Sequence, residues 1–80
     1  MGTGRRRPKN LNRKLLAIRN KLDVSQTEMA RLLDLDVAYT AISGYELGTR
    51  QPDLLVLLRY ARLAGVSTDV LIDDKLKLPD

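Results

Sequence analysis

The apolar residues of this chain recur at helical spacing, in short blocks separated by residues that favour helix ends. Leu11, Leu15, Ile18 and Leu22 fall at i, i+4, i+7 and i+11, which places them on one face of a helix. No segment shows the convincing alternation of apolar and polar residues that a half-buried strand would show. The 80 residues contain no Cys, so one small domain has to be held together by an aliphatic core rather than by disulfides. The pattern therefore predicts an all-α fold.

Capping residues divide the rest of the chain into four further helices. The tetrapeptide Ser-Gln-Thr-Glu at 25–28 matches a capping box, and Met29, Leu32 and Leu33 supply the apolar face of the helix that it starts. The acid-rich stretch at 34–36 ends this helix. Gly48, which suits the left-handed conformation, ends the third helix, and Gly65 ends the fourth. The expected N-caps of the first, second, fourth and fifth helices are Asn10, Ser25, Asp53 and Ser67. Five helices joined by loops of a few residues indicate a helical bundle.

The positive charge is concentrated at the N-terminus. Residues 1–21 carry eight Lys and Arg and no acid, whereas residues 22–80 carry six basic residues against ten acids, a net charge of −4. We expect residues 1–10 to form a basic arm that is mobile when nothing is bound, followed by a helical domain at 11–73 and a tail at 74–80. A polyanion such as nucleic acid suits the arm, and a solubilising tail is the alternative. The basic side chains of the arm are Arg5, Arg6, Arg7 and Lys9.

Composition argues against an enzyme and against a membrane protein. The chain lacks His and Cys, the commonest general base and the thiolate ligand of metals, and it has no glycine-rich phosphate loop. The acidic pair at 73–74 adjoins a solvated tail that implies no cleft. No apolar run approaches the roughly 20 residues of a membrane span, and no secretory segment follows the basic residues. We expect a cytoplasmic protein with no metal, no cofactor and no evident small-molecule ligand.

Three motifs together resemble those of one family. They are Ser-Gln-Thr-Glu-Met-Ala at 25–30, Ile-Ser-Gly-Tyr-Glu-Leu-Gly-Thr-Arg-Gln-Pro at 42–52, and Leu-Leu-Arg-Tyr-Ala-Arg-Leu-Ala-Gly-Val-Ser at 57–67. At these spacings the chain resembles the lambda-repressor/Cro type of helix-turn-helix regulator, also called the xenobiotic-response-element family. The resemblance implies a five-helix lambda-repressor-like DNA-binding domain that regulates transcription in a bacterium or phage. The third helix, at about 37–47, would lie in the major groove of double-stranded DNA, with the second helix across the backbone.

The chain departs from the family pattern in the turn between the second and third helices. Asp34 stands where the family usually has Gly, and two additional residues separate Ala30 from Ile42. Either the link is longer than usual, or the third helix gains about half a turn at its N-terminus. In the second case Asp36 would cap the extended helix.

The resemblance also implies which side chains contact DNA. Gln26 would hold a phosphate at the N-terminus of the second helix, where free amides and the helix dipole favour anions. Arg50 would lie near a phosphate after the recognition helix. The base-facing residues would be Tyr39, Thr40 and Ser43, with Gly44 in the next slot. The alternatives are an exposed polar role for Gln26, core packing for Tyr39 and a solvated loop charge for Arg50.

One further pair is expected to be structural. In the family, the Glu that corresponds to Glu46 pairs with an Arg on the first helix, which is Arg19 here. Such a partly buried pair fixes the orientation of two helices and costs several kcal/mol when one partner is removed.

The sequence leaves two questions about the partners of this protein open. A protein-interaction module on the same scaffold, antitoxin-like or an adaptor, would explain the absence of basic residues from 37–48 and the acidic body. A homodimer formed through the C-terminal region would suit a regulator that recognises two half-sites. The apolar candidates for that dimer face are Val70, Leu71, Ile72, Leu76 and Leu78. These side chains would otherwise close the core of the monomer.

Overall fold

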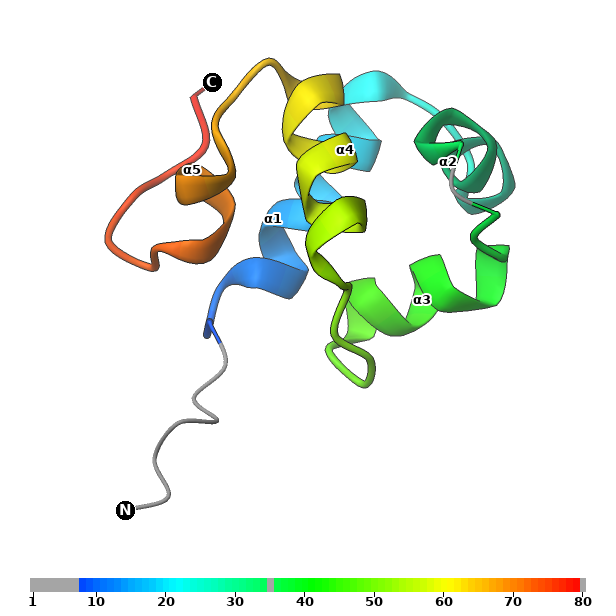
Figure 1. The fold of residues 1–80 in the computed structure, drawn as a ribbon, viewed down its shortest axis with the longest axis horizontal. Coiled ribbons are helices and arrows are strands. Elements are labelled where there is room, and N and C mark those ends of the chain that lie inside the picture. The colour runs from blue at the N-terminus through cyan, green and yellow to red at the C-terminus, as the bar shows by residue number, and fades with distance from the viewer. Residues whose placement is uncertain (1–7, 35, 80) are drawn as a thin grey trace.

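The computed structural model describes residues 8–34 and 36–79, and in this part of the chain it contains five α-helices and no strand. The all-α prediction with five helices is therefore confirmed. Helices α2 and α3 lie on one side of α1 and α4, and the short α5 lies on the other side (Figure 1). The helices are α1 (Leu11–Leu22), α2 (Gln26–Leu33), α3 (Tyr39–Leu47), α4 (Leu54–Ala64) and α5 (Thr68–Ile72).

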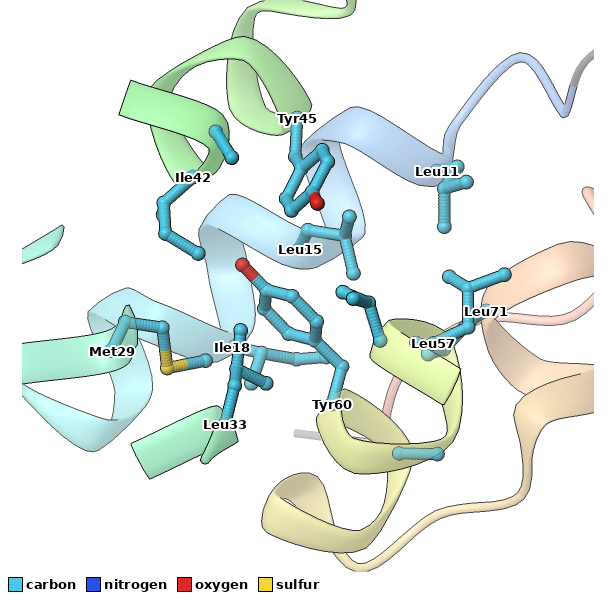
Figure 2. Packing of buried hydrophobic residues seen from close by; sticks show 13 residues of the cluster. Leu11, Leu15, Ile18, Met29, Leu33, Ile42, Tyr45, Leu57, Tyr60 and Leu71 are labelled. Carbon is cyan, nitrogen blue, oxygen red and sulfur yellow. The ribbon is translucent and has the colours of Figure 1, made fainter. Parts of the chain in front are cut away.

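All five helices contribute to one apolar core. Tyr60 of α4 is its largest fully buried side chain, and Figure 2 shows its ring extending toward α1, with Leu15 and Ile18 beside it. Burial of one such apolar side chain stabilises the fold by about 1.5–3 kcal/mol. Leu32, expected on the apolar face of α2, is instead 44% exposed, because Met29 and Leu33 already take the inner face.

Several predicted helix caps are present in the structure. The Glu28 amide donates to Ser25 Oγ at 3.1 Å, and the Ser25 amide donates to Glu28 Oε1 at 3.4 Å, which completes the capping box. Asp53 Oδ1 accepts the Val56 amide at 3.0 Å at the start of α4. The two predicted glycines adopt the left-handed conformation after α3 and α4.

Two expected N-cap residues hold their positions without a side-chain hydrogen bond, and Asp36 does not act as a cap. Asn10 and Ser67 occupy the N-cap positions of α1 and α5, but neither side chain makes a capping hydrogen bond. Asp36 does not cap α3, because Ala38 occupies its N-cap position. Helix α3 begins at Tyr39, two residues later than expected, so the additional residues lengthen the link instead of the helix.

The N-terminus of α1 is held by the segment that follows α5. The amides of Lys9 and Asn10 donate to the Asp74 carboxylate at 2.9 and 3.0 Å. One turn further along α1, Lys14 is only 8% exposed, and its ammonium donates to the carbonyls of Val70 at 2.7 Å and Asp73 at 3.0 Å. A cation is favourable at these carbonyls, which lie at the C-terminal end of α5. The side chains of Asp74 and Lys14 thus fix α5 and the start of the expected tail against α1.

The Asp74 contact predicts a pH-dependent stability. The two amides that Asp74 accepts hold the pKa of its carboxyl below the usual value. Because the folded pKa is depressed, this contribution is present above the unfolded pKa of about 3.9 and is lost as the pH falls through the folded pKa. We expect Asp74→Asn to lower the melting temperature at pH 7 and to reduce its fall between pH 5 and pH 2. Circular dichroism melts at several pH values test this, with Asp69→Asn as the control; equal pH profiles for native and Asp74→Asn proteins would contradict it.

The turn after α2 contains a strained backbone position. Asp34 has φ of +53°, which costs a non-glycine residue roughly 1–2 kcal/mol, and its carboxylate lies at the unfavourable C-terminal end of a helix. We expect Asp34→Gly to raise the free energy of unfolding by about 1 kcal/mol, measured by urea denaturation. Asp34→Ala removes the charge but keeps the Cβ atom, and equal stability of the two variants would show that backbone strain is not the cause.

Candidate nucleic-acid interface

Helix α3 presents a polar face to solvent and an apolar face to the core. Ile42 and Tyr45 are buried on the inner face. Tyr39, at 57% exposure, and Thr40 lie on the outer face, and Ser43 is half-buried beside them. The core-packing alternative for Tyr39 is therefore not what the structure shows. The three side chains expected to face bases lie along one outward side of a helix.

An ion pair between Arg19 and Glu46, joined by a hydrogen bond from Gln26, connects α1, α2 and α3. Arg19 Nε lies 2.6 Å from Glu46 Oε2, and Arg19 Nη2 donates to Glu46 Oε1 at 3.1 Å. The Glu46 side chain is 5% exposed and that of Arg19 is 18% exposed. The hydrogen bond that Arg19 donates to the Glu46 carboxylate is the main cause that raises the pKa of Arg19, so this guanidinium stays charged. The structure thus brings together the two residues expected to form a structural pair.

Gln26 belongs to the same network, which sequence reasoning missed. Its Nε2 donates to Glu46 Oε1 at 3.0 Å, and the side chain is half-buried. Gln26 is the first residue of α2, where backbone amides have no partner within the helix. One carboxylate on α3 therefore orients both the Arg of α1 and the side chain at the start of α2.

The turn after α3 folds back onto the helix at Gly44. The Gly44 carbonyl accepts the amides of Thr49 at 3.0 Å and Arg50 at 3.2 Å, and also the Thr49 hydroxyl at 3.4 Å. Arg50 itself is exposed. Burial raises the pKa of Tyr45, and the positive charge of Arg50 opposes that shift, as expected of two groups on adjacent parts of this turn.

The basic residues of the N-terminal region divide into two groups. Lys14 and Arg19 are engaged inside the protein, by carbonyls of α5 and by Glu46. Lys9 and Arg13 are exposed. The three arginines expected in the arm, at 5–7, lie outside the described residues. The basic side chains of this region that are exposed among the described residues are those of Lys9, Arg13 and Lys21.

The C-terminal apolar residues do not act as one group. Leu71 is fully buried and Leu78 packs against the core, so these two close the monomer. Ile72 and Leu76 are 42% and 40% exposed. Within the described ranges, none of the helices combines the length and apolarity that crossing a bilayer requires.

Comparisons with known proteins agree with this architecture. Residues 15–71 match the family model described as helix-turn-helix, and the chain belongs to that family. The resemblance to lambda-repressor/Cro-type regulators is therefore confirmed. The structure is similar to that of the P22 c2 repressor in complex with the synthetic operator 9T in the presence of Tl+. The TM-score is 0.71 at 25% identity, over 80% of this chain and 94% of that chain. A comparison with curated proteins gave no match.

Proposed function

We propose that this protein is a sequence-specific transcriptional regulator that binds double-stranded DNA with α3 in the major groove. The proposal rests on two features of α3. Its outer face is polar, and its Glu46 carboxylate points inward and binds side chains of α1 and α2. A recognition helix has to be held rigidly while it presents its side chains to base edges. The similar P22 c2 repressor is in complex with a synthetic operator, which supports the same kind of partner here.

The proposed contacts divide into phosphate and base contacts. Backbone amides at the start of α2 suit a phosphate, and Gln26 would assist with the amide hydrogen that Glu46 does not use. On α3, hydroxyls at 39, 40 and 43 can bond to several base edges, and the Thr40 methyl can contact a thymine methyl. Lys9 and the arginines at 5–7 would contact phosphates or enter the minor groove.

The alternative is a protein-interaction module, antitoxin-like or an adaptor. It is favoured by the absence of Lys and Arg from residues 37–48 and by the acidic charge of residues 22–80. Both proposals share the fold, so a binding measurement has to separate them.

Fluorescence anisotropy with a random-sequence duplex, measured across a salt series, tests the proposal. We expect binding whose affinity falls steeply with salt, because Lys and Arg contacts to phosphates release counterions. The double variant Thr40→Glu/Ser43→Glu places two charges on the outer face of α3 and should abolish binding. Lys77→Glu changes the net charge equally in the C-terminal segment and should reduce binding far less. No binding by the native protein even at low salt would favour the interaction module.

We also propose that the regulator acts as a homodimer. One small module contacts only a few base pairs, and two-fold dimers recognise two half-sites about one helical turn apart. Leu54 is 79% exposed, and it lines the same open hollow as Ile72, so the two offer an apolar surface to a second copy. The mass in solution, measured by light scattering with and without duplex DNA, should show two chains per duplex. A single chain on every duplex would contradict the dimer.

A further inference from the structure

Helix α3 lacks a side chain that could identify a base pair on its own. Its outward positions carry Tyr39, Thr40, Ser43, Gly44 and Leu47. Specific contacts to guanine or adenine usually come from side chains with two hydrogen-bonding groups, such as Arg, Asn or Gln. A single hydroxyl can accept a hydrogen bond from one base or donate one to another, so it discriminates weakly between base pairs. The outer face of α3 therefore provides less specificity than a sequence-specific regulator needs.

Arg50 lies where a side chain at position 44 would be. A Cβ atom built on Gly44 would be 2.9 Å from Arg50 Cβ and 3.6 Å from Arg50 Cδ. The aliphatic part of Arg50 therefore crosses the surface of α3 at Gly44. Its guanidinium is bonded to Cδ, so it begins beside Gly44. Glycine at 44 is required for this arrangement, because real Cβ contacts as short as 2.9 Å essentially do not occur.

The position of Arg50 is fixed by the backbone. The Gly44 carbonyl accepts the amides of both Thr49 and Arg50, so the turn is fastened to α3 itself. Among residues 8–34 and 36–79, no carboxylate forms an ion pair with Arg50 and no acceptor takes a hydrogen bond from its side chain. The N–H donors of its guanidinium are thus free for an external ligand. The first carbons of the same side chain are already held in place beside Gly44.

We propose that Arg50 supplies the base contact that α3 lacks and selects a guanine through its N7 and O6 atoms. Arginine pairs with these two acceptors through two parallel N–H donors, which lysine cannot reproduce. This assignment rests on the proposed DNA-binding function and goes beyond the phosphate contact that the family resemblance implies for this residue. Arg50 acts here as a specificity-determining residue carried by the turn after α3 and seated on Gly44.

The test is selection from a duplex library with a randomised centre, using the full chain and three variants. We expect the native protein to select a G at one position of each half-site. Arg50→Lys keeps the charge and should lose that preference by about 10-fold or more, with the other positions unchanged. Gly44→Ala should lose the same preference, because its Cβ displaces Arg50 while α3 remains helical by circular dichroism. Arg62→Lys, an exposed change on α4, should select the native site.

The outcomes separate this inference from the function on which it rests. If Arg50→Lys and Gly44→Ala keep the full preference for every base, Arg50 is a phosphate contact and the inference is wrong. If Arg50→Lys lowers the affinity for all sequences equally and the base preference does not change, Arg50 is likewise a phosphate contact. If the native protein binds no duplex, the proposed function itself fails. Loss of the G preference in both variants and not in Arg62→Lys supports the assignment.

Discussion

Replacing Glu46 with Ala is expected to lower the free energy of unfolding by about 3 kcal/mol. Removing one partner of a buried ion pair costs about 3–5 kcal/mol, because the other charge is left unpaired, and the 18% exposure of Arg19 places this site at the low end. Glu46→Ala also removes the acceptor of the Gln26 amide, so the start of α2 loses its link to α3. Urea denaturation followed by circular dichroism measures the effect.

A double-mutant cycle identifies the ion pair as the cause. Arg19→Met alone should also destabilise, since it leaves Glu46 buried without its cation. Glu46→Leu is the second single variant of the cycle. The double variant Arg19→Met/Glu46→Leu should lose clearly less than the sum of Arg19→Met and Glu46→Leu, because apolar side chains of similar volume often replace a buried pair at little cost. Additive losses would mean that the two residues act independently and that the network does not hold α1 to α3.

Changing Arg5, Arg6 and Arg7 together to Gln is expected to weaken DNA binding by about two to three orders of magnitude near 0.1 M salt. Each phosphate contact contributes about 0.9 to the slope of log affinity against log salt, so three lost contacts reduce that slope by about 2.7. Substitution is preferable to deletion of the arm, because the Lys9 amide donates to Asp74 and deletion would disturb the fold. Anisotropy at several salt concentrations measures both quantities.

A charge-matched variant controls for net charge. The triple change Arg62→Gln, Lys75→Gln and Lys77→Gln removes three exposed basic side chains from α4 and the C-terminal segment. It should reduce the salt slope far less than the change at 5–7, because these residues lie on α4 and the C-terminal segment rather than on α3. Equal effects of the two triple variants would show that overall charge, rather than the arm, attracts the DNA.

Local signals determined most of the helix boundaries, and this is why they could be predicted. The capping box at Ser25, the N-cap at Asp53 and the left-handed glycine at 48 act within a few residues of sequence. The start of α3 could not be fixed, because Asp36 is a favourable cap by residue type but lies in a turn with φ of +57°. The residue type shows that a side chain could cap a helix, but the backbone conformation at that position decides whether it does.

The contacts that sequence reasoning missed join residues far apart in the chain. Asp74 accepts amides 64 and 65 residues away, and Lys14 donates to carbonyls 56 and 59 residues away. Nothing in the local sequence distinguishes Lys14 from an exposed lysine of α1. The Arg19 and Glu46 pairing was predicted only through the family resemblance, and the third partner, Gln26, became visible only with the helices in place. The C-terminal leucines could not be assigned from the sequence for the same reason. The position of α5 against the other helices decides which of them are buried in the core.

An NMR titration with DNA reports which helices of the protein contact the duplex. Amide resonances of 15N-labelled protein would be followed while a duplex selected by the native chain is added. We predict that the largest shifts fall on residues 39–44, on the first turn of α2 and on residues 49–51, with small shifts on α5. Shifts concentrated on α5 and residues 73–79, with α3 unaffected, would show that α3 does not enter the major groove.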